Sequence, residues 1–213
     1  MSAGDFTTAK IASVGSSYPN SVSAADAFSA RLYGMGIGAC FLTIFGGIWV
    51  TLSMVIMHWL GPLPVTILTV ALVALLFMSG ALIRRTASAA RHATNSKARK
   101  RIGRSLGRIN GIQWGLICAA YFLLRIGHHE AFLLPVIILI VGLHFFPLGI
   151  VFRYWLYHVT GIALVLWTAI YLGLLHWPPD SPEGAFGTGV ILLVAAAITL
   201  TTAFGSDQWR EQH

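Results

Sequence analysis

The sequence predicts an all-α integral membrane protein: a bundle of six transmembrane helices that form three helical hairpins. Three observations support this fold class. Of the 213 residues, 56% are hydrophobic and only 10% are charged, and the mean hydropathy is +0.76. Six apolar runs each approach the ~20 residues that cross a ~30 Å hydrocarbon core. Nine of the 14 lysines and arginines lie within residues 84–108, as in a basic loop beside a membrane.

Because lipid cannot satisfy backbone polar groups, we expect every apolar run to be a helix. The expected spans are residues 34–59, 64–83, 109–127, 131–152, 155–177 and 186–203. The last span is short and rich in Gly, Ala and Thr. The spans divide the chain into a flexible N-terminal tail (1–30), a transmembrane domain (31–205, including the basic loop 84–108) and a C-terminal tail (206–213). The N-terminal tail lacks the apolar core and cleavage site of a secretory signal, and residues 24–32 could form a short interfacial helix.

The charge distribution predicts the orientation. With the basic loop on the cytoplasmic side, only Arg125 of the basic residues lies outside, whereas Glu130, Asp180 and Glu183 fall in outer loops. Both termini are therefore expected in the cytoplasm, and the 84–108 loop is expected to contact anionic lipids of the bilayer. A net charge of +7 could suggest nucleic acid, but no aromatic or groove-reading module accompanies the basic residues, so we expect no nucleic-acid partner.

The three expected hairpins share short sequence features. Residues 63–65 and 134–136 are both Leu-Pro-Val at the start of a span, and a histidine stands near the outer end of each hairpin's first helix (His58, His128 and His176). A true repeat would place a site between the hairpins. Apolar helices also resemble one another by chance, so the repeat is one of two interpretations.

The third span has the clearest packing signal. Small residues recur every four positions, and such a ridge lets another helix approach closely in lipid; the ridge consists of Gly103, Gly107, Gly111, Gly115 and then Ala119. An intramolecular contact is the favoured interpretation, and a homo-oligomer seam or a membrane partner is the alternative. Because Asn110 and Gln113 lie on the opposite face, this helix is expected to be central in the bundle.

Polar side chains at similar depths suggest a buried site. Gln113, His144 and His158 come from three helices, about 6 to 13 Å from the cytoplasmic ends at 1.5 Å per residue, with Tyr157 and Asn110 nearby. The functional interpretation is a cytoplasm-facing pocket with His144 as its titrating centre. The alternative is an interhelical hydrogen-bond network that only fixes packing. No intramembrane carboxylate accompanies these histidines, although a proton-coupled pump usually needs one.

The outer histidines offer a weaker signal. His128, His129 and His176 could bind a transition metal or provide haem ligands, but His-Trp at a helix end is ordinary interfacial anchoring. No cofactor is predicted, and haem b is the alternative. The chain has no CxxCH, HExxH, GxSxG or nucleotide loop, so an enzyme is the less favoured interpretation. Cys40 and Cys118 are expected to be small core residues.

Three stretches carry a resemblance: RIGRSLGRINGIQWG at 101–115, IVGLHFFPLGIVF at 140–152 and YWLYHVTG at 154–161. They resemble a group of uncharacterised bacterial inner-membrane proteins with a GLHFxPL motif. That group has paired tyrosines where this chain has Tyr157-His158, so a role for His144 transfers better than one for His158. The resemblance implies a bacterial inner-membrane location and no particular activity.

Together these patterns favour transport or sensing of a small solute or ion through the cytoplasmic-half pocket. A non-catalytic accessory or assembly subunit, docked through the glycine ridge, is one alternative. A haem-b membrane subunit is the other.

Overall fold

The computed structural model describes the backbone of residues 24–93 and 96–211 and the side chains of residues 28–88 and 103–206. Within these residues the chain is helical and contains no strand. The six α-helices are α1 (Ala24–Ile56), α2 (Pro62–Ala93), α3 (Ser96–Ile126), α4 (Leu133–Phe152), α5 (Trp155–Ala169) and α6 (Pro182–Glu211). A 3-10 turn (Glu130–Phe132) precedes α4, and a π-helical segment (Ile170–Leu174) extends α5. The predicted all-α fold is confirmed.

All six helices are long and apolar enough to cross a membrane, including the sixth, whose apolar part is Pro182–Ser206. Large apolar side chains also cover the outside of the bundle: Phe77, Ile126 and Leu174 are each about three-quarters exposed. A surface of this kind suits lipid and not water. The chain is therefore a multi-pass membrane protein.

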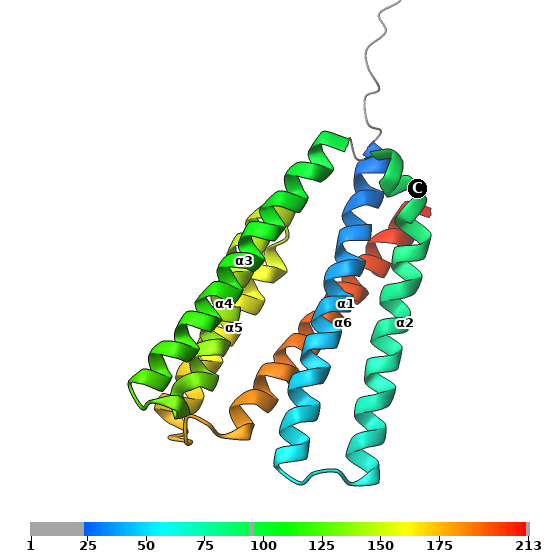
Figure 1. Ribbon diagram of the computed structural model, residues 1–213. Coiled ribbons are helices and arrows are strands. Elements are labelled where there is room, and N and C mark those ends of the chain that lie inside the picture. Colours follow the sequence, from blue (N-terminus) through cyan, green and yellow to red (C-terminus); the bar gives the residue numbers. More distant parts are fainter. Residues whose placement is uncertain (1–23, 94–95, 212–213) are drawn as a thin grey trace, which may run out of the picture.

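The helices form two groups of three (Figure 1). In one group α1 packs against both α2 and α6, and in the other α4 packs against α3 and α5. The contact between α5 and α6 is the main connection between the groups. Each expected hairpin pair does pack together, but the most extensive contact joins α1 to α6, which are far apart in sequence.

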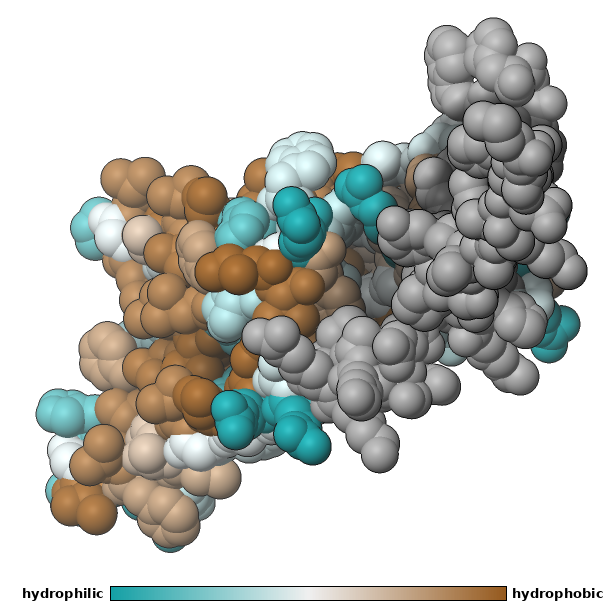
Figure 2. Space-filling view, turned by 90° about the horizontal axis from the view of Figure 1, so that it is seen from above, coloured by the Kyte–Doolittle hydropathy of each residue, from teal (hydrophilic) through white to brown (hydrophobic). Residues whose placement is uncertain are grey.

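The two ends of the bundle differ in charge. At one end, here called the arginine end, lie the exposed Arg31, Arg84, Arg104 and Arg153. The opposite end, the histidine end, holds the turns at His58, His128 and His176 and the acidic residues Glu130, Asp180 and Glu183. Figure 2 views the bundle from the arginine end, where hydrophilic side chains lie among hydrophobic ones.

Glycines at two crossings bring helices into close contact. A Cβ on Gly189 of α6 would lie 2.7 Å from the carbonyl oxygen of Gly46 on α1, and a Cβ on Gly161 of α5 would lie 2.7 Å from that of Gly142 on α4. Neither pair belongs to a four-residue ridge. Each group of helices therefore has one glycine-to-glycine crossing, because only the absence of a side chain allows backbones to approach so closely.

The structure corrects the predicted position of the third helix. None of the apolar part of α3 is buried, whereas half of that of α6 is, and among the other helices α3 packs mainly against α4. Its partly buried side chains repeat at helical spacing along one face: Ser105, Leu106, Ile109, Gln113, Ile117, Ala120 and Leu124. The ridge faces the opposite way, so α3 is peripheral.

The described helices also extend beyond the predicted boundaries. Residues 24–30, expected in the tail, form the first turns of α1, and α6 continues to Glu211. The expected basic loop at 84–108 is helical in all its described residues, since α2 ends at Ala93 and α3 begins at Ser96. The rest of the N-terminal tail lies outside the described residues.

Candidate functional site

The five residues of the predicted pocket differ in their surroundings. Tyr157 is buried, Gln113, His144 and His158 are half-buried, and Asn110 is exposed on α3. Within the described side chains, none of the five forms a hydrogen bond with another. The expected shared polar network is thus not formed between these groups.

His144 belongs to α4, whereas His158 belongs to α5 and packs against a different side of α4. The ring of His158 rests on Gly149, where a Cβ would come within 2.6 Å of Nε2, and its centroid is 5.8 Å from that of Phe146. His144 precedes Gly149 by five residues, which is about 140° around a helix at 3.6 residues per turn. The ring nearest to His144 is that of its neighbour Phe145, at 6.2 Å. Equal depth therefore did not imply a shared site.

Tyr157 instead faces the first helix. Its hydroxyl lies where a Cβ of Gly38 on α1 would be, and its ring lies 5.5 Å from Tyr154, 5.9 Å from Phe152 and 6.0 Å from Phe145, measured between centroids. This cluster joins the two helix groups near the arginine end. The contact of Tyr157 with α1 could not be read from the sequence, because it depends on which helices are neighbours.

Tyr154 extends the same junction to α6. Its side chain is buried, and burial raises the pKa of its phenol by more than the hydroxyls of Thr199 and Thr202 and the Arg31 guanidinium lower it. The phenol therefore stays protonated and able to donate a hydrogen bond near the end of the bundle. The polar cluster found here consists of Arg31, Tyr154, Thr199 and Thr202, none of which belonged to the predicted pocket.

The histidines at the opposite end have a backbone role. His58 and His128 have positive φ values of 57° and 56°. At the end of α1, Trp59 N–H donates to Met54 O (2.9 Å) and His58 N–H donates to Val55 O (3.2 Å). This pair of bonds is a Schellman C-cap, in which the left-handed residue is usually glycine. His128 ends α3 with the same two bonds, and His176 is also left-handed, with φ 51°.

The metal interpretation gains no geometric support. Among the described residues, no group of three His, Cys, Asp or Glu side chains comes together in a way that could hold a metal ion. His128, His129 and His176 are all exposed. What His128 and His176 share is the left-handed turn at a helix end, a conformation that Arg153 also adopts at the end of α4.

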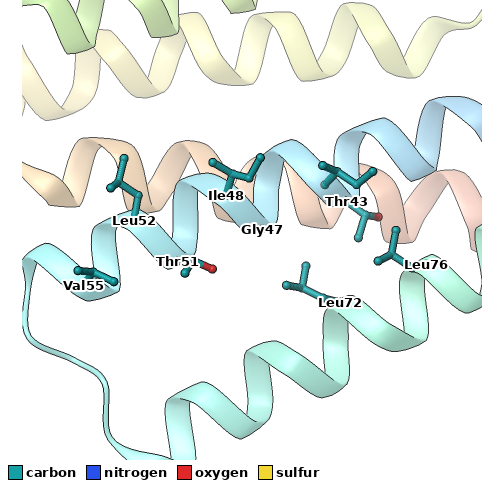
Figure 3. Close-up of a pocket in the computed structure, with 9 residues that line it drawn as sticks. Thr43, Gly47, Ile48, Thr51, Leu52, Val55, Leu72 and Leu76 are labelled. Atoms are coloured by element: carbon teal, nitrogen blue, oxygen red, sulfur yellow. The ribbon is translucent and has the colours of Figure 1, made fainter.

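A groove of about 460 Å³ lies between α1 and α2 (Figure 3). It is lined almost wholly by apolar side chains and is widely open, and it includes Gly47 of α1 and Leu72 of α2. The hydroxyl of Thr43 in this groove donates to Ala39 O (2.8 Å) in its own helix. With so little polar lining, the groove resembles a lipid-facing furrow and not a solute pocket.

The open face of α3 is the remaining candidate site, here called the ridge face. Cβ atoms built on its glycines would meet nothing within 4 Å, unlike those at the two crossings; these glycines are Gly103, Gly107, Gly111 and Gly115. Cys118 and Ala119 continue the face, and both are exposed. Arg104 and Arg108 lie beside it toward the arginine end, also exposed.

The fold and these surfaces define a helical, multi-pass membrane protein with one helix packed on a single side. No family model, curated protein or solved structure matches the chain.

Proposed function

We propose that this protein is a non-catalytic accessory or assembly subunit of a membrane complex, which binds a partner helix through the ridge face of α3. One observation carries the proposal: small residues recur every four positions over the exposed face of a helix that is packed on its other side only. In the two observed crossings, glycines of this chain are used for close helix contacts. The ridge face offers the same kind of surface, and nothing among the described residues packs against its glycines.

The physical argument concerns what drives association inside a bilayer. Lipid tails are as apolar as leucine, so helices associate there through close packing and not through hydrophobicity. A glycine ridge that faces outward makes no close contact with the other helices of its own bundle. Each glycine in the middle of a helix also destabilises it by about 0.5–1 kcal/mol relative to alanine. A partner helix that packs on the ridge would offset that cost.

The test compares two glycines of similar depth. Gly111 lies three residues after Arg108 on the ridge face, and Gly80 lies four residues before Arg84 on α2, also with nothing within 4 Å of its Cβ. Native membranes would be extracted in mild detergent and the particle mass measured. Gly111→Leu is expected to reduce a larger complex to the mass of the single subunit, whereas Gly80→Leu leaves the complex intact. An unchanged complex in Gly111→Leu would refute the proposal.

Transport or sensing through the polar pocket stays a prediction. Its residues are divided between the two sides of α4 and the contact with α1, so no geometric observation favours it over assembly. The haem-b interpretation also stays a prediction.

A further inference from the structure

The charged residues beside the ridge face indicate the chemistry of a partner that would bind there. Arg104 and Arg108 stand one turn apart, each three residues before a ridge glycine and so about 60° from it around the helix. Both are exposed, and neither makes an ion pair within the described residues. The helix α3 has no acidic residue from Ser96 to Ile126. Within the described part of the chain, no acidic side chain therefore neutralises the positive charge beside the ridge face at the arginine end.

A second copy of the chain matches this pattern poorly. Copies inserted in one orientation meet about an axis along the membrane normal, so α3 would run parallel to its counterpart at equal depth. Arg104 and Arg108 would then approach the same two arginines. Of the acidic residues in the described helices and turns, Glu130, Asp180 and Glu183 lie at the histidine end, a full helix length away. Asp26, Asp207 and Glu211 belong to α1 and α6, in the other group of helices. Like charges at matched positions disfavour that pairing.

Resting on the proposed function, we infer that the partner is a transmembrane helix of another protein, with small residues facing the ridge and carboxylates at the depth of Arg104 and Arg108. The small residues permit close packing, and the carboxylates neutralise guanidinium groups, which form charge-assisted bonds with them. Charge complementarity near the headgroup region would select this partner, while packing along the ridge would hold it.

The experiment uses a synthetic helix as the probe. The full-length protein, labelled with a fluorescent donor, is reconstituted in phosphatidylcholine vesicles with an acceptor-labelled transmembrane peptide. The peptide has glycine at every fourth position of a leucine background and two glutamates one turn apart at one end; a matched peptide has two lysines there. Energy transfer is expected to show at least tenfold tighter association with the glutamate peptide.

Three variants locate the effect. Arg104→Gln with Arg108→Gln should abolish the preference, Arg84→Gln with Arg85→Gln should preserve it, and Gly111→Leu should weaken binding of both peptides. Equal binding of the two peptides to the wild type would overturn the inference about charge and leave the assembly proposal standing. If the two peptides bind equally and phosphatidylglycerol copurifies only when Arg104 and Arg108 are present, the arginines bind an anionic lipid instead. That result would also overturn the inference.

A second measurement tests for self-association. With Cys40→Ala, Cys118 is the only cysteine left, and it lies on the ridge face. Oxidation in the membrane should give no disulfide-linked dimer. A strong Cys118 dimer would identify the partner as a second copy, which contradicts the inference but supports assembly. Failure of the assembly proposal itself would appear separately, as an intact native complex in Gly111→Leu.

Discussion

At the residue scale, the histidines at helix ends show how a sequence pattern can have a backbone cause. The three histidines at corresponding positions, His58, His128 and His176, each adopt a left-handed conformation where a helix ends, as Arg153 also does at the end of α4. A side chain in that conformation costs about 1–2 kcal/mol, which glycine avoids. The repeat was readable from the sequence, whereas its cause required the backbone angles.

This interpretation predicts that His58→Gly stabilises the protein by about 1 kcal/mol, because glycine adopts positive φ without a steric penalty. His58→Val should destabilise it by a similar amount. The matched control is His129→Gly, since His129 has a negative φ of −116° and gains nothing from glycine. The free energy of unfolding in mixed detergent micelles measures all three. A loss of stability in His58→Gly equal to that in His129→Gly would contradict the C-cap role.

At the element scale, the glycines divide into two classes that the sequence alone did not separate. The periodic glycines of α3 face outward, while the isolated Gly46, Gly142, Gly161 and Gly189 make the closest contacts between helix backbones. The four-residue repeat of glycines identified a surface suited to close helix packing. It did not show whether the helix that packs there belongs to this chain. Helix number was predictable because each span is a local property; helix neighbours depend on contacts between distant segments, such as α1 with α6.

This division predicts opposite effects of one substitution. Gly189→Ala should destabilise the protein by about 1–3 kcal/mol, because the new Cβ would meet backbone atoms of Gly46 and Val50. Gly80→Ala should be neutral or stabilise by up to about 1 kcal/mol, since its surroundings are open and alanine favours the helix. Thermal unfolding in detergent distinguishes the two. Equal midpoints for both variants would show that the α1–α6 crossing is not close-packed.

The connection between α5 and α6 depends on Trp167. Its indole Nε1–H donates to Gly184 O (2.9 Å), and its ring occupies the place of a Cβ on Gly187. Trp167→Phe should lower the free energy of unfolding by about 1–2 kcal/mol, through the lost hydrogen bond and lost contact area. Trp114→Phe, on the exposed side of α3, is the control and should change little. A similar loss in both variants would indicate a general effect of removing indole.

At the scale of the whole molecule, two groups of three helices meet through α5 and α6, with tyrosines near one end and tryptophan near the other. The sequence predicted the six spans. It also predicted that basic residues gather at one end of the bundle and acidic residues at the other, because both features follow from composition along the chain. It did not predict that the polar residues of the expected pocket would separate. Depth along a helix can be counted from the sequence, but the direction of a side chain depends on which neighbours its helix has.

The central claim is that the ridge face of α3 contacts a partner in the membrane. Photocrosslinking tests it most directly: in a Cys40→Ala background, a benzophenone maleimide on Cys118 is irradiated in native membranes. The account predicts an adduct larger than the subunit, absent when the label is placed instead on Ile150→Cys, at an exposed position of α4, in a chain that also has Cys118→Ala. Adducts from both positions, or from neither, would contradict it.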